Sequence, residues 1–246
     1  MGLGHEEGWS IPFDHPFYPP LPAHYRNVVF QMVYFQAALD AVARLLPAPL
    51  EPAPSGLCLA MGLRIPFSTA YGPFCEAVVQ EQCVFRGQTG WYCSHVWHDG
   101  PSGIAAGREI YGTPKVFAVL KVRQVERAMT TTAAMGGLPV VTISSTLEAR
   151  ASPADVPPLA PAWRLKVIPR ADGPGPALKQ LVDCAAATQD LEVHQCWAGR
   201  GVVRFEPTPQ GDVSGLRPLA YHQAFQLEAS YTEGYARIAY DYLAGQ

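Results

Sequence analysis

Short runs of β-branched, aromatic and aliphatic residues recur along the chain, separated by glycine, proline and other turn residues. This pattern is typical of strands. We predict strands at residues 28–34, 56–63, 76–85, 91–97, 116–122, 140–147, 163–168, 191–197 and 202–205. Residues 36–46 indicate one helix, because apolar side chains recur there at helical spacing until Pro47 ends the pattern.

Two further segments, residues 177–188 and 228–243, fit a helix or a strand equally well. Many short strands with few helices favour a barrel or packed antiparallel sheets. We therefore expect an α+β fold, mostly antiparallel β, with few peripheral helices. A barrel formed by a chain of this length can enclose a pocket for a small ligand.

The 24 prolines gather in four clusters, which predict loops. The first cluster, residues 12–22, indicates an extended N-terminal arm over residues 1–24. The others cover residues 47–54, 153–161 and 169–176. Of these, residues 153–161 are the best candidate for a seam between two halves of the chain.

The composition excludes several classes of protein. With 48% hydrophobic and 16% charged residues, the chain can form a core and is not expected to be disordered. A net charge of −3 gives no basic face, which argues against nucleic acid as a partner. No apolar run approaches the roughly 20 residues of a membrane span, and the first ten residues lack a secretory pattern. We expect a cytoplasmic protein.

The cysteines and histidines predict no metal site. None of the six cysteines forms a CxxC pair, so reduced, buried thiols are favoured over a disulfide framework. His95 and His98 are three residues apart and face opposite sides of a strand. His194 and Cys196 have no partners at metal-ligand spacing.

Lys115 is the most distinctive candidate for chemistry among only four lysines. It follows the turn residues Gly112 and Pro114 and enters an apolar strand, where its amine would be poorly solvated. An amine must be neutral to attack a ketone, and burial favours the neutral form. The alternative is a lysine that reaches solvent at the end of a strand, which composition alone favours.

The segment around Lys115 resembles the signature of the acetoacetate decarboxylase family. Gly107-Arg108-Glu109 is followed five residues later by Pro114-Lys115, as in that signature. Similar matches occur in order along nearly the whole chain, at residues 46–52, 71–76, 165–173, 193–199 and 240–243. The resemblance therefore shifts the balance in favour of a reactive Lys115.

The resemblance implies a single domain over residues 1–246, built as a cone-like, mostly antiparallel β-barrel around a buried pocket. It implies a homo-oligomer, no metal and no organic cofactor. Lys115 takes the role of the amine that forms an imine with the substrate, and Glu76 falls on the family's active-site glutamate. In acetoacetate decarboxylase itself, the lysine is known to be activated by desolvation or by a cationic neighbour.

Two positions depart from the family pattern. Val116 stands where decarboxylases usually carry a second lysine, so cationic assistance is missing there. Asn27 stands near the position of an early arginine that can hold the substrate carboxylate. Arg26 is one residue away and would face the other side of the strand. We keep both Arg26 and Asn27 as candidate substrate-binding residues.

Further candidates for the substrate pocket come from the motif and from nearby aromatic residues. Arg108 and Glu109 either contact the substrate or form an ion pair beneath the pocket. Aromatic side chains could wall the pocket and exclude water, although ordinary core packing is the alternative for each. These aromatic residues are Phe30, Tyr34, Trp97, Tyr111 and Phe117.

Three functions remain open at this point. The leading hypothesis is decarboxylation of a β-keto acid such as acetoacetate through a Lys115 imine, assisted by Glu76. The second keeps the imine but performs aldol or dehydration chemistry on a pyruvate-type 2-keto acid, as divergent relatives in secondary metabolism do. The third is a non-catalytic barrel that binds a small ligand.

Overall fold

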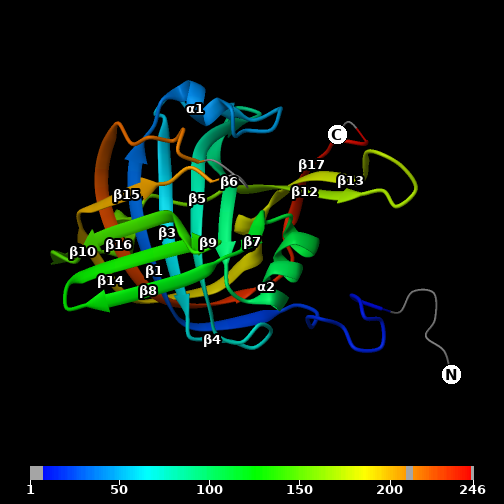
Figure 1. Ribbon diagram of the computed structural model, residues 1–246, viewed down its shortest axis with the longest axis horizontal. Helices are drawn as coiled ribbons and strands as arrows, with labels where there is room; N and C mark the ends of the chain where they lie inside the picture. The colour runs from blue at the N-terminus through cyan, green and yellow to red at the C-terminus, as the bar shows by residue number, and fades with distance from the viewer. Residues whose placement is uncertain (1–7, 209–212, 245–246) are drawn as a thin grey trace.

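The computed structural model describes residues 8–208 and 213–244. Two β-sheets dominate these residues, and Figure 1 shows the smaller sheet crossing one face of the larger. The smaller sheet has the order β15-β10-β9-β8. Its strands are β8 (Val119–Val125), β9 (Ala128–Met135), β10 (Leu138–Thr146) and β15 (Gly201–Phe205).

The larger sheet has 13 strands, ten of which follow the order β11-β14-β16-β1-β3-β5-β6-β12-β13-β17. These are β11 (Ala149–Arg150), β14 (Thr188–Gly199), β16 (Ala220–Glu233), β1 (Ala23–Gln36), β3 (Leu57–Ile65), β5 (Phe74–Phe85), β6 (Gln88–His98), β12 (Ala162–Pro169), β13 (Pro176–Asp183) and β17 (Arg237–Asp241). Three short strands pair beside this path, namely β2 (Glu51–Pro52), β4 (Phe67–Ser68) and β7 (Lys115–Phe117).

Nearly all pairings are antiparallel, as expected for this mostly antiparallel fold. The exceptions are the parallel pairs that β6 makes with β12 and with β7. Among the described residues no pairing joins β11 to β17, the two ends of the path. The cone-like closed barrel therefore stays a prediction.

The central strands of the larger sheet are buried on both faces. Along β1, Val33 and Phe35 face the smaller sheet, whereas Met32 and Tyr34 face the opposite side. This alternation follows from the two-residue period of a strand. One face thus supplies the core between the sheets, and the other face is free to line a cavity.

Short helical segments connect the strands. They are α1 (Leu39–Ala43), α2 (Pro101–Ala106), the π-helical turn η1 (Gly107–Tyr111), and the 3₁₀ turns η2 (Pro153–Asp155) and η3 (Cys184–Ala187). The predicted helix at residues 36–46 is therefore only five residues long. Residues 8–22 contain neither helix nor strand, and the remainder of the expected arm before residue 8 lies outside the described residues.

All nine predicted strand segments coincide with strands, although Gly56 and Leu147 lie just beyond β3 and β10, and residues 116–122 are divided between β7 and β8 at Ala118. Of the two undecided segments, residues 177–188 form most of β13 and then η3. Residues 228–243 contain the end of β16 and all of β17. The pattern missed β9 and the helical segment formed by α2 and η1.

No helix in residues 8–208 and 213–244 is long and apolar enough to cross a membrane. All six cysteines are free thiols, four of them buried. Within the same residues no group of three or more histidine, cysteine, aspartate or glutamate side chains could hold a metal ion.

One carboxyl group is buried inside the larger sheet without a counter-charge. Glu81 on β5 is 0% exposed, and the Ser94 hydroxyl donates a 2.6 Å hydrogen bond to its Oε1. Its Oε2 is buried without a hydrogen-bond partner among the described residues. Burial raises the pKa of Glu81 to about 8, so the folded protein keeps this carboxyl protonated at neutral pH.

We expect this buried acid to make the protein less stable as the pH rises. Between pH 4.5, the ordinary pKa of the group, and about 8, the unfolded chain loses the Glu81 proton while the folded chain retains it. The free energy of unfolding then falls by at most about 1.4 kcal/mol per pH unit. Chemical denaturation of Glu81→Gln across this range should show a flatter profile than wild type.

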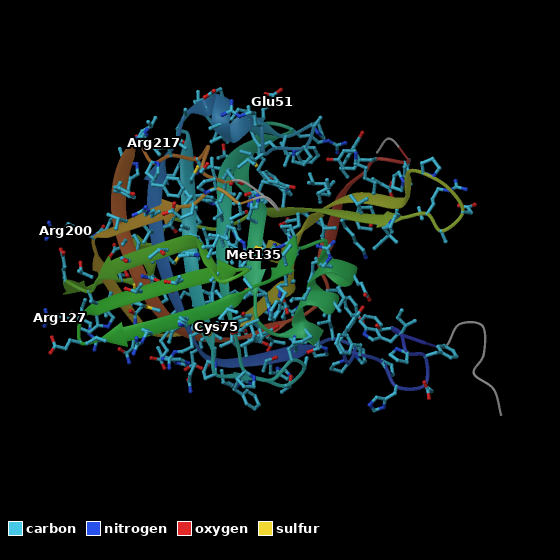
Figure 2. The ribbon with its side chains drawn as sticks, viewed as in Figure 1. Glu51, Cys75, Arg127, Met135, Arg200 and Arg217 are labelled. Atoms are coloured by element: carbon cyan, nitrogen blue, oxygen red, sulfur yellow. The ribbon has the colours of Figure 1, made fainter. Side chains whose placement is uncertain are left out.

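Glu51 provides the matched control, because its side chain lies on the surface beside α1 (Figure 2). The variant Glu51→Gln should retain the wild-type slope. Parallel profiles for wild type and Glu81→Gln would contradict a protonated Glu81 in the folded protein.

Candidate active site

Lys115 is positioned by a sharp turn after the helical segment. Gly112 ends η1 with φ of +73°, a left-handed conformation that favours glycine. A Cβ atom at Gly112 would lie 2.3 Å from the Cα atom of Lys166, so η1 packs directly against β12. The chain then enters β7, where Lys115 pairs in register with Val96 of β6.

The side chain of Lys115 passes back over Gly107. A Cβ atom on Gly107 would lie 2.7 Å from Cε and 2.8 Å from Cδ of the lysine. The π-helical turn therefore needs glycine at this position, since any larger residue would displace the lysine stem. Widened turns of this kind are frequent at functional sites.

Lys115 and Glu76 form a close ion pair. Lys115 Nζ lies 2.7 Å from Glu76 Oε1, and the two side chains are only 14% and 13% exposed. Burial acts to raise the pKa of Glu76, but Lys115, with smaller contributions from His98 and Arg164, opposes it, and together these groups hold the pKa below its usual value. Glu76 is therefore an anion at neutral pH.

His98 supports Glu76 from the adjacent strand. It pairs in register with Glu76, is 0% exposed, and places Nε2 3.4 Å from Glu76 Oε1. The backbone N–H of Gly100 donates a 2.7 Å hydrogen bond to Nδ1, which leaves the proton of the neutral ring on Nε2, facing the carboxylate. Burial lowers the pKa of His98 to about 4, so the ring is neutral.

The ion pair opens into a cavity of about 500 Å³ on the face of the larger sheet opposite the smaller sheet. Its walls are largely apolar and include Met32, Met61 and Leu63 from β1 and β3. Residues 156–160 of the third proline cluster also line it. The segment expected to be a seam between two halves is therefore part of the cavity wall.

A second carboxyl group, Glu233, lies in the same cavity at the end of β16. The Tyr25 hydroxyl donates a 2.8 Å hydrogen bond to its Oε2. Burial raises the pKa of Glu233, even though Lys115, Tyr25 and Arg164 act in the opposite direction. The pKa values of Glu76 and Glu233 are thus displaced in opposite directions, as in sites that need one carboxylate and one protonated acid.

Arg164 on β12 also lines the cavity. Its Nε and Nη1 atoms are buried and have no hydrogen-bond partner among the described residues. Sequence reasoning missed both Arg164 and Glu233. The only local signal for Arg164 is a charged residue between Trp163 and Leu165, and Glu233 lies in a segment whose structure the pattern left undecided.

Two of the predicted substrate-binding residues, Phe30 and Tyr111, line the cavity. Tyr111 is fixed there because its hydroxyl donates a 2.7 Å hydrogen bond to the carbonyl oxygen of Gly234. Of the other aromatic candidates, Tyr34 packs in the core beside the cavity and Trp97 packs between the two sheets. Phe117 does not line the cavity and is 60% exposed.

The structure places the remaining predicted binding residues outside the cavity. Arg26 and Asn27 line a separate polar cleft, because a bulge interrupts β1 there and Asn27 has φ of 54°. Arg108 is exposed, and its Nη1 donates a 3.1 Å hydrogen bond to the carbonyl oxygen of Lys115. Glu109 accepts a 2.5 Å hydrogen bond from the hydroxyl of Tyr18. Arg108 and Glu109 thus support the turn around Lys115 rather than lining the cavity.

The family model described as acetoacetate decarboxylase matches residues 6–243. The chain belongs to the acetoacetate decarboxylase family. It is 26% identical over 244 residues to acetoacetate decarboxylase 3 of Mesorhizobium japonicum, covering 97% of this chain and 93% of that protein. It is 27% identical to acetoacetate decarboxylase 1 of Bradyrhizobium diazoefficiens, covering 96% and 94%.

Two solved structures have the fold of this chain. The acetoacetate decarboxylase of Legionella pneumophila is 22% identical with a TM-score of 0.87, covering 99% of this chain and 100% of that chain. The enduracididine biosynthesis enzyme MppR, solved with the condensation product of pyruvate and imidazole 4-carboxaldehyde, is 22% identical with a TM-score of 0.81. That match covers 98% of this chain and 100% of MppR. The fold thus occurs in enzymes of more than one activity.

We expect Gly107→Ala to displace the Lys115 amine without unfolding the protein. The backbone at Gly107 has helical angles that alanine accepts, whereas the new Cβ atom would collide with the lysine stem. A displacement of about 1 Å can cost roughly 100-fold in rate. Borohydride trapping of a keto-acid adduct should therefore slow by about 10- to 100-fold, with little change in melting temperature.

Gly173→Ala is the matched control, because nothing lies within 4 Å of the position that its Cβ atom would take. This variant should trap the adduct at the wild-type rate. An unchanged trapping rate in Gly107→Ala would show that the lysine does not need the space over this glycine.

Proposed function

We propose that this protein is a lyase that forms an imine between Lys115 and a small keto acid and decarboxylates a β-keto acid such as acetoacetate. The observation that carries the proposal is a lysine amine in a largely apolar cavity, 2.7 Å from an ionised glutamate. Membership of the acetoacetate decarboxylase family supports the same reaction class. The cavity volume of about 500 Å³ suits a small substrate.

The reaction begins when the amine of Lys115, having given up its proton, adds to the ketone carbon. The resulting carbinolamine loses its hydroxyl as water and becomes a protonated imine. The electron pair of the bond between the α-carbon and the carboxylate then moves toward the imine nitrogen. Carbon dioxide leaves and an enamine forms, after which protonation at carbon and hydrolysis release the ketone and the free amine.

The two carboxyl groups have different tasks in this mechanism. Glu76, held as an anion, pairs with the lysine and receives its proton, and the neutral ring of His98 keeps this carboxylate in place. Glu233, with its raised pKa, supplies a proton to the departing hydroxyl and regains it from the water that hydrolyses the final imine. Glu76 passes the proton that it took from the lysine to the enamine carbon. The apolar walls keep the imine away from bulk water until decarboxylation is complete.

A second candidate function keeps the Lys115 imine but joins or cleaves carbon–carbon bonds of a pyruvate-type 2-keto acid. The absence of a second lysine at Val116 favours it, because the cationic assistance typical of decarboxylases is missing. The likeness of fold to MppR, whose structure holds a condensation product of pyruvate, favours it as well. The family match over residues 6–243 keeps decarboxylation first.

Intact-mass analysis after borohydride reduction tests the imine and separates the two candidates. Wild type incubated with acetoacetate should gain a reduced adduct that lacks the carboxyl group, and Lys115→Ala should gain none. The exposed Lys121 gives the control, and Lys121→Ala should behave as wild type. A persistent pyruvate adduct without decarboxylation of acetoacetate would favour the second candidate. No adduct with either acid would leave only ligand binding.

We expect Glu233→Gln to lower kcat by about 10²- to 10⁴-fold, the usual contribution of a general acid. Because the pKa of Glu233 is raised, wild-type activity should decline as the pH rises above the ordinary range of a glutamate and this carboxyl ionises. The variant should lose that descending limb of the pH–rate profile. If Glu233→Gln retains both the descending limb of the pH–rate profile and the wild-type rate, Glu233 does not act as the general acid.

A further inference from the structure

The arginine on β12 differs from the surface arginines of this chain. Arg127, Arg200 and Arg217 lie at the periphery of the molecule (Figure 2), and Arg200 pairs with Glu148 at 2.8 Å. Arg164 instead lines the cavity that contains Lys115. Among the described residues no carboxylate lies within 4 Å of its guanidinium, and two of its nitrogen atoms are buried without a hydrogen-bond partner.

A guanidinium in this position carries an uncompensated charge. Arginine stays protonated in proteins, and an unpaired buried ion costs several kcal/mol. The neighbouring Cys184 thiol is hydrogen-bonded to the guanidinium, but it does not supply a counter-charge, because burial raises the pKa of this thiol. Glu76 is engaged by Lys115 at 2.7 Å, and burial favours the neutral acid at Glu233. The cavity therefore has an excess of positive charge that an anion from outside the protein would balance.

We propose that Arg164 binds the carboxylate of the keto-acid substrate while Lys115 reacts with its ketone carbon. The inference rests on the proposed imine chemistry. It gives Arg164 the role of holding the substrate carboxylate, for which the sequence analysis had kept Arg26 and Asn27 as candidates. The fork of donors on a guanidinium matches the two oxygens of a carboxylate. The cavity is largely apolar, and two nitrogen atoms of this fork are buried, so a carboxylate gains more from the contact than an uncharged group does.

This anchor makes the site selective for keto acids over neutral ketones of the same size. Acetoacetate and pentane-2,4-dione share the same acetyl and methylene groups. Acetoacetate ends in a carboxylate, whereas pentane-2,4-dione ends in a second, uncharged acetyl group. Both can react with an amine through a ketone carbon. Only acetoacetate can form a charge-assisted pair with Arg164, so the two probes separate anchoring from imine formation.

The test measures the Lys115 adduct against the concentration of each probe, in wild type and in Arg164→Gln. Borohydride reduction traps the adduct of acetoacetate, and ultraviolet absorbance follows the conjugated enaminone that pentane-2,4-dione forms with an amine. The half-saturating concentration of acetoacetate should rise by roughly 10- to 100-fold in the variant, as expected for loss of a hydrogen-bonded charge pair. The value for pentane-2,4-dione should change by less than about twofold. Arg164→Lys keeps the charge but loses the fork of donors. Its half-saturating concentration of acetoacetate should therefore lie between those of wild type and Arg164→Gln.

Arg26→Gln is the matched control, because it removes the same charge from the separate polar cleft. It should leave both half-saturating concentrations unchanged. Equal weakening of both probes in Arg164→Gln would show that Arg164 only supports the cavity, and no weakening of either would show that it binds nothing. Either outcome overturns the inference and leaves the imine chemistry intact.

Binding of an unreactive acid tests the anchor without any imine. Butyrate should raise the melting temperature of wild type but not of Arg164→Gln, whereas butyramide should affect both equally. If wild type traps neither ketone, the proposed function fails, and the butyrate result still decides whether Arg164 holds a carboxylate. Arg164→Lys serves as the second variant if Arg164→Gln does not fold, and a wild type that butyrate does not stabilise overturns the anchor.

Discussion

The contact between the Lys115 amine and the Glu76 carboxylate is the interaction that the rest of the site depends on. The Lys115 side chain is 14% exposed and the Glu76 side chain is 13% exposed. Charges that are removed from water to this degree are stable only when they are paired. The neutral ring of His98, fixed by the Gly100 backbone, holds the carboxylate on its other side. The atoms that the proposed function uses therefore also stabilise this part of the fold.

The fold supplies this pair with a cavity because the central strands of the larger sheet have two different faces. The face that packs against the smaller sheet is filled by Val33, Phe35 and their neighbours, and it makes the frame rigid. The opposite face leaves a cavity whose side chains come from strands far apart in the chain. The turn from η1 into β7 then places one lysine at the edge of that cavity.

The sequence predicted the parts of this arrangement that are local. Alternation and β-branched content located the nine strand segments, and the motif at residues 107–115 located Lys115. It missed β9, whose alanine, threonine and methionine residues lack a strong strand pattern. It could not place Arg26 and Asn27, because the bulge in β1 breaks the alternation on which the argument relied. Arg164 and Glu233 join the site only through long-range pairing of strands, which no local pattern records.

The part of the cavity wall formed by Pro153 and residues 156–160 can change without disturbing the rest of the site. This loop is one continuous stretch of chain, rich in proline, and it joins β11 to β12 without contributing an acid, a base or a nucleophile to the cavity. Its length and bulk can therefore change while the lysine, its partner glutamate and the sheet stay as they are. In the proposed function, changes to this loop would therefore alter the fit of the substrate side chain, while Lys115, Glu76 and Arg164 keep their places on other elements.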